Sequence, residues 1–117
     1  MPTQSPLSGT KTHRLLSAAA SDNATNVSAR NCTVVRITGF NNKASAAFLK
    51  LYDKATAPAS TDTPRKTYRL AASANFDFDC DDYYGQGFGY RITGAAADND
   101  ATALVAGDIV ALNIDYR

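Results

Sequence analysis

Apolar and polar residues alternate in several short runs along this chain of 117 residues. In the run 75–81, Phe76, Phe78 and Cys80 alternate with three aspartates. In the run 87–93, every second residue is Phe, Tyr or Ile. Because successive side chains of a β-strand point to opposite faces, both runs predict strands with one face in an apolar core.

Further strands are predicted where β-branched, aromatic or other apolar residues stand between turn residues. These segments are 13–20, 23–29, 32–38, 46–53, 66–71 and 107–116. The segment 13–20 has the weakest pattern. The segment 46–53 is the most helix-like part of the chain, but its residues also alternate and we interpret it as a strand. We predict a turn at 39–43 and, because of its two prolines, a long surface loop at 55–64.

Roughly seven or eight short strands separated by turn signals predict an all-β protein, a single antiparallel β-sandwich of jelly-roll-like type. The dense Ile, Val and Leu residues of 107–116 favour a central strand. Residues 1–12 contain two prolines and a glycine, which predicts a flexible, extended N-terminal arm. The sandwich domain is therefore expected at 13–117, a length that suits one domain.

Charge adds little to this picture. The net charge is +1 and the basic residues are scattered, so we expect no nucleic-acid partner. No apolar run approaches the length needed to cross a membrane, so we expect no membrane partner. All 11 acidic residues are Asp, which favours turns and caps over helices. The N-terminus lacks the apolar core of a secretory signal, so Cys32 and Cys80 are expected to stay thiols, although a disulfide between them is left open.

The aspartates of 77–82 raise the question of a calcium loop. An EF-hand that begins at Asp77 needs Gly at its sixth position and Glu at its twelfth, where this chain has Asp82 and Phe88. We therefore interpret the stretch as a half-buried strand with an acidic outer face. A cation site of another type, or an acidic face that meets a basic partner subunit, remains an alternative. Asp98 and Asp100 could also help to bind calcium, but we interpret this segment as a turn, because Asp side chains hydrogen-bond to their own backbone.

No catalytic site is predicted. His13 is the only histidine and has no motif around it. Cys32 and Cys80 fall in strand patterns that predict buried, inert thiols. The glycine-rich segment 85–89 does not open a helix, so it is not a phosphate cradle. The sequence thus predicts a protein that is not an enzyme, with no catalytic, cofactor-binding or metal-binding residues.

Several segments together resemble a group of small tailed-bacteriophage virion proteins. Residues 48–55, followed by Pro58 and 61–64, are similar to the group's "YLKLYDKA…P…GTDTP" core. Residues 87–94, 97–102, 106–110 and 113–116 are similar to its closing "GLAYAITGGAADTDTTAVAAGDVVVNLDY", and 24–28 to its "ATNATSV". The resemblance covers about residues 24–116. The chain departs from the group at Ser60, where Gly is usual, and in the acidic strand.

The resemblance implies a virion β-sandwich without catalytic residues. We expect a capsid decoration or cement protein, made in the host cytoplasm, that binds the outside of the head lattice and stabilises it. Its expected partners are the major capsid protein and further copies of itself, as a homo-oligomer for which a trimer is one form. The expected contact segments are the arm 1–12 and the loop 55–64.

Two alternatives stay open. A tail, baseplate or fibre-associated sandwich would bind another tail protein or a host surface glycan. A host-cell binding module unrelated to phage would be an isolated monomer.

Overall fold

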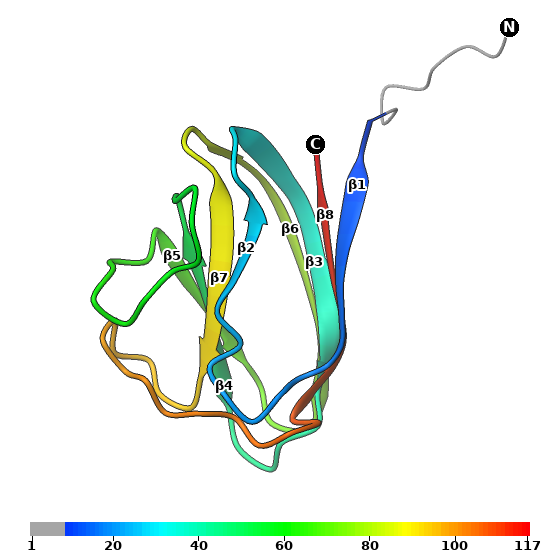
Figure 1. Ribbon diagram of the computed structural model, residues 1–117. Helices are drawn as coiled ribbons and strands as arrows, with labels where there is room; N and C mark the ends of the chain where they lie inside the picture. The colour runs from blue at the N-terminus through cyan, green and yellow to red at the C-terminus, as the bar shows by residue number, and fades with distance from the viewer. Residues whose placement is uncertain (1–8) are drawn as a thin grey trace, which may run out of the picture.

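Eight β-strands build the protein in a computed structural model that describes residues 9–117 (Figure 1). The strands are β1 (Lys11–Ser17), β2 (Thr25–Ser28), β3 (Cys32–Asn41), β4 (Ala47–Tyr52), β5 (Lys66–Leu70), β6 (Ala74–Tyr84), β7 (Phe88–Thr93) and β8 (Ile109–Tyr116). Within residues 9–117 there is no helix with the length and apolar character needed to span a membrane.

The strands form two four-stranded antiparallel sheets that face each other. Sheet A has the order β1-β8-β3-β6, and sheet B has the order β2-β7-β4-β5. The pairs β1·β8, β2·β7, β3·β6 and β4·β5 are all antiparallel neighbours. This arrangement is the jelly roll, so the predicted all-β sandwich is confirmed, and β8 is an internal strand as expected.

The core lies between the two sheets and follows the predicted alternation. Its fully buried residues include Ile37, Leu49, Leu51, Ile92, Leu112 and Ile114. Each side chain of this size contributes about 1.5–3 kcal/mol when it is removed from water. The inward faces of sheets A and B therefore account for the packing of the sandwich.

Strand β3 is longer than predicted because it continues through Gly39, where a turn was expected. Gly39 pairs with Phe76 of β6. A Cβ at residue 39 would lie 2.5 Å from Phe76 Cζ, so the missing side chain makes room for this ring. The predicted turn at 39–43 is therefore wrong for residues 39–41, where glycine serves close packing inside a strand.

The N-terminal boundary also differs from the expected one. Strand β1 begins at Lys11, two residues inside the predicted arm, because Lys11 and Thr12 pair with Tyr116 and Asp115 of β8. Residues 1–8 of the predicted arm lie outside the described residues.

Three register shifts interrupt the pairing in sheet A, and two of them fall at Val35, where β3 shifts against both β6 and β8. Residues 80 and 81 of β6 lie opposite Val35 alone, and Asp81 has a φ of 53°. In β8, the pairing with β3 shifts at Ala111, which also has a φ of 53°. Such bulges bend a strand and strengthen its twist.

The outer faces of the two sheets differ. The segments after β4 and after β7 run along sheet B on the side away from sheet A (Figure 1). Beneath them Lys50, Tyr52, Arg91 and Thr93 are buried, although they point away from the core. The outer side chains of sheet A are largely exposed or half-buried. Sheet A therefore has the more accessible outer face of the two sheets.

Candidate functional site

The acidic stretch lies on strand β6, at one edge of sheet A. Within residues 9–117, β6 pairs with β3 on one side and with no strand on the other. Phe76 is buried and Phe78 is half-buried, whereas Asp77, Asp79 and Asp81 are exposed. The predicted half-buried strand with an acidic outer face is confirmed.

The carboxylates of β6 pair with basic side chains. Arg36 of β3 donates two hydrogen bonds to Asp77, Nε to Oδ1 at 2.9 Å and NH2 to Oδ2 at 2.6 Å. These bonds hold the pKa of Asp77 below its usual value. Asp82 turns to the other side of the strand and accepts a hydrogen bond from Lys66 of β5.

The aspartates of β6 therefore do not converge on one point. In the part of the chain that the structure describes, no group of three or more His, Cys and Asp side chains is placed to hold a metal ion.

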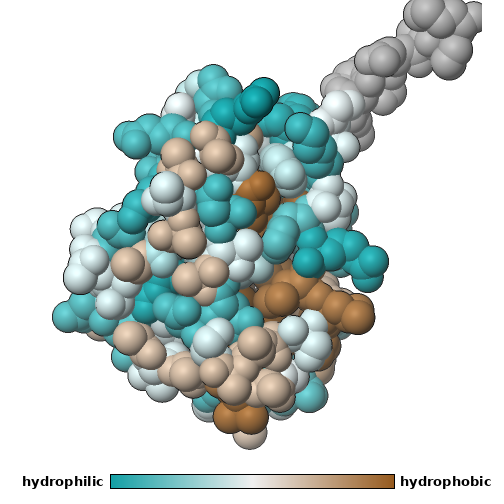
Figure 2. Space-filling model, viewed as in Figure 1, coloured by the Kyte–Doolittle hydropathy of each residue, from teal (hydrophilic) through white to brown (hydrophobic). Residues whose placement is uncertain are grey.

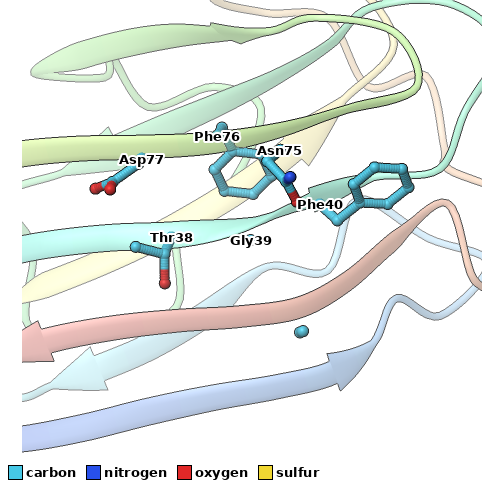
Figure 3. Close-up of a pocket in the computed structure, with 7 residues that line it drawn as sticks. Thr38, Gly39, Phe40, Asn75, Phe76 and Asp77 are labelled. Carbon is cyan, nitrogen blue, oxygen red and sulfur yellow. The ribbon is translucent and has the colours of Figure 1, made fainter.

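A groove of about 330 Å³ opens on sheet A between β3 and β6 (Figure 3). Its walls combine aromatic, amide, hydroxyl and carboxylate groups. The lining residues are Thr38, Gly39, Phe40, Asn75, Phe76, Asp77 and Ala111. The ring of Phe40 is directed away from that of Phe76, so the groove has an aromatic side chain at one end and Asp77 at the other (Figure 3).

Strand β1 forms the opposite edge of sheet A and carries basic and apolar groups. Lys11 and Arg14 are exposed, and neither forms an ion pair within residues 9–117. Leu16 is 71% exposed, the largest exposure among the large hydrophobic residues of this part. An apolar cluster is visible on the side of the molecule where β1 ends (Figure 2).

A buried cationic pair lies on the outer face of sheet B. Lys50 and Arg91 are directly opposite each other in β4 and β7, and both are fully buried. Like charges in this position repel. Arg91 is compensated by Asp22 at 2.7 Å and by the hydroxyl of Tyr52 at 3.0 Å.

The same pair holds the segment after β7 in place. Lys50 donates to the carbonyl of Ala97, and Arg91 donates to the carbonyl of Asp100. Burial, together with the charge of Arg91, lowers the pKa of Lys50. The cations thus anchor a loop to sheet B, which is a structural task.

The predicted Asp98–Asp100 turn is observed. Asp100 accepts hydrogen bonds from the amides of Ala95 and Thr102 and from the hydroxyl of Thr102. Its oxygens are therefore used to close the loop.

The loop 55–64 is also tied down. Asp62 accepts hydrogen bonds from Lys54 Nζ at 2.6 Å and from the amide of Ala59 at 2.8 Å. Pro58 is buried against Gly89, where a Cβ would lie 2.9 Å from Pro58 Cδ. Pro58 thus packs this loop on sheet B, while most of its other residues stay exposed.

The single histidine and the two cysteines do not form a site together. His13 Nε2 lies 2.9 Å from the hydroxyl of Tyr90, and burial lowers the pKa of His13. Cys32 is buried and Cys80 is half-buried, and both are free thiols. Burial raises the pKa of each thiol, which disfavours the reactive thiolate.

Sequence reasoning missed Arg14, Leu16 and Phe40 as candidate surface residues. They lie on β1 and β3, and only the pairing of sheet A relates them to the acidic strand. The one local sign in the sequence was that Arg14 and Leu16 stand two residues apart, and so on one face of a strand, in the weakly patterned segment 13–20.

Comparison with known proteins adds no relative: no protein-family model, no curated protein and no solved structure matches this chain. The resemblance to phage virion proteins stays a prediction.

Proposed function

We propose that this protein is a bacteriophage virion structural protein, a capsid decoration or cement protein that binds the outside of the head lattice. The observation that carries the proposal is the contrast between the two sheets. Loops cover the outer face of sheet B, whereas within residues 9–117 sheet A has an open outer face and a long edge strand, β6, with one side unpaired. An open sheet with free edges suits a protein that works by contact with other subunits.

Two further points support this role. The motifs of residues 24–116 resemble those of small virion proteins, and the jelly roll is a fold that viral capsid proteins use. A fold does not determine function by itself, so the motifs and the open sheet carry more weight.

Weak contacts suffice for a protein of this kind. Each backbone hydrogen bond at an edge strand contributes a net free energy of only about 0.5–1.5 kcal/mol, so the contact of one copy is weak. Many copies on one shell add up, because each copy bridges neighbours that are already held together.

The groove on sheet A favours a second candidate function, a tail, baseplate or fibre-associated protein that binds a glycan. The jelly roll also occurs in lectin domains. Phe40 offers an apolar ring, and Thr38, Asn75 and Asp77 offer hydrogen-bonding groups beside it. The exposed residues of the loop 55–64 are a second place where a sugar could bind.

The number of copies in purified virions, measured by quantitative mass spectrometry against the major capsid protein, distinguishes these functions. A copy number comparable with that of the capsid protein is expected for a decoration protein. A small copy number would favour the tail or baseplate. Absence from the virion would overturn both.

A further inference from the structure

The two edge strands of sheet A, which have no further strand beside them within residues 9–117, carry opposite charges. Strand β1 presents Lys11 and Arg14, and β6 presents Asp77 and Asp79, which share Arg36 of their own copy as an ion-pair partner. The side chains of Asp77 and Asp79 are 54% and 95% exposed. An edge strand also exposes backbone N–H and C=O groups that have no partner. The two edges are therefore complementary both in side-chain charge and in unpaired backbone donors and acceptors.

The registers of sheet A place one pair of these charges, Arg14 and Asp77, at a matching height. One row across the sheet runs from Arg14 through Asn113 and Thr38 to Asp77. The next row runs from Thr12 through Asp115 and Arg36 to Asp79. A second copy placed beside the first at the same height therefore brings its Arg14 opposite Asp77.

The strand directions fit as well. Sheet A has four strands and all its neighbours are antiparallel, so β1 and β6 run in opposite directions. A second copy in the same orientation therefore presents its β1 antiparallel to β6. We propose that sheet A continues from one copy into the next, with β6 paired to β1 of a second copy.

The lengths of the two edges agree with this pairing. With Arg14 opposite Asp77, the seven residues of β1 fall opposite residues 74–80. That segment ends where the bulge at residues 80 and 81 begins. Beyond the bulge, the guanidinium of Arg65 donates to the carbonyl of Tyr83 and occupies the far end of β6.

An apolar contact accompanies the charge pair. In the same register, Leu16 falls opposite Asn75, which lines the groove together with Phe40 and Phe76. Leu16 is 71% exposed in the single copy. The pairing therefore moves an exposed leucine to a groove with aromatic walls, which adds burial to the backbone hydrogen bonds.

Charge also selects the head-to-tail arrangement. Two β6 strands side by side would place aspartates against aspartates, and two β1 strands would gather Lys11 and Arg14. A head-to-tail contact uses different surfaces of the two copies and builds a ring or an open chain. This inference concerns the chain alone and does not rest on the proposed virion function.

Sedimentation velocity of the full chain over a range of concentrations tests the pairing. The wild-type chain is expected to associate, whether into a ring of fixed mass or into chains that grow with concentration. Arg14→Asp and Asp77→Lys are each expected to weaken association about tenfold or more, because each places like charges opposite each other. Arg30→Asp and Asp98→Lys, which make the same charge changes at other exposed positions, are expected to leave it unchanged.

The double variant Arg14→Asp/Asp77→Lys gives the sharpest result. It exchanges the two charges, so a head-to-tail contact regains its attraction and association returns. Circular dichroism confirms that each variant is folded. If the loss of the Arg36 pair disturbs the folding of Asp77→Lys, Asp79→Lys takes its place among the single variants, because residue 79 is diagonal to Arg14 in this register. A wild-type chain that stays monomeric, single variants that associate normally, or a double variant that stays dissociated would each overturn the proposal.

Discussion

At the level of single residues, the hydroxyl of Tyr84 is a polar group buried without a hydrogen-bond partner within residues 9–117. The ring packs edge-on against Phe88, with centroids 4.9 Å apart, and the guanidinium of Arg65 lies 4.6 Å from its centroid. Burial raises the pKa of Tyr84. The ring thus contributes to the core, whereas the hydroxyl opposes folding.

Removal of this hydroxyl is expected to stabilise the protein. Tyr84→Phe keeps the ring and should raise the free energy of unfolding by about 1 kcal/mol in urea titrations. Tyr52→Phe is the matched control, because it removes an acceptor of the buried Arg91 and should lower that free energy by about 1–3 kcal/mol. A loss of stability in Tyr84→Phe would show that its hydroxyl has a partner.

Asp62 makes stability depend on acid pH. Its hydrogen bond from Lys54, followed by that from the amide of Ala59, lowers its pKa in the folded protein. The carboxylate therefore stabilises the fold above the pKa of an unfolded Asp, about 4. This contribution is lost as the pH falls through the lower, folded pKa.

We expect Asp62→Asn to be less stable than the wild-type protein at pH 7. The difference should shrink as the pH falls from about 4 through the lower pKa of the folded protein, below which the wild-type carboxyl is protonated in both states. Urea unfolding at a series of pH values measures it. A difference that stays constant with pH would argue against a charge effect at this position.

At the level of elements, the bulge in β8 contains strain that the sequence does not reveal. Ala111 has a φ of 53°, a left-handed conformation that disfavours residues with a Cβ. Ala111→Gly is expected to raise the free energy of unfolding by up to about 1 kcal/mol. Ala101→Gly, in an exposed loop with ordinary backbone, should lower it slightly. Destabilisation by Ala111→Gly would contradict the strained bulge.

The loop after β7 depends on Asp100 in the same way. Its carboxylate accepts three hydrogen bonds within the loop, so Asp100→Ala should lower the free energy of unfolding by about 1–3 kcal/mol. Asp98→Ala, at an exposed neighbouring position, should change it by less than about 0.5 kcal/mol. Thermal unfolding of the two variants checks this, and equal melting temperatures would contradict the anchoring role.

Most strands were predictable because one face of each enters the core. The period of two in β6 and β7 has that cause, and even the helix-like segment that became β4 is a strand with Leu49 and Leu51 inside. The turn predicted from Gly39 was wrong, although a glycine close to two asparagines, here Asn41 and Asn42, is typical of a turn. The position of Gly39 in β3 depends on Phe76, which is distant in sequence.

The outer face of sheet B shows a second limit of local patterns. Lys50 and Arg91 alternate with apolar residues, which predicts solvent exposure. They are buried because loops from elsewhere in the chain lie over them, and Asp22 is far away in sequence. A two-residue period indicates which face of the sheet a side chain lies on, but it does not indicate whether other segments of the chain cover that face.

At the level of the whole molecule, the number and spacing of strands indicated a jelly roll, but not the register of its sheets. The register is what relates Arg14 to Asp77 and Leu16 to the groove. The acidic face of β6 was predicted, including an alternative in which it meets a basic partner subunit. The basic edge at β1 was not, because residues 11 and 12 were assigned to the arm.

Hydrogen exchange of the backbone amides, followed by mass spectrometry or NMR, tests the pairing of β6 with β1 most directly. Amides of residues 74–80 that point away from β3 should exchange more slowly in the associated wild-type chain than in Arg14→Asp. Amides of the β5 edge should exchange alike in both proteins. Equal rates at residues 74–80 in the two proteins would contradict assembly through this edge.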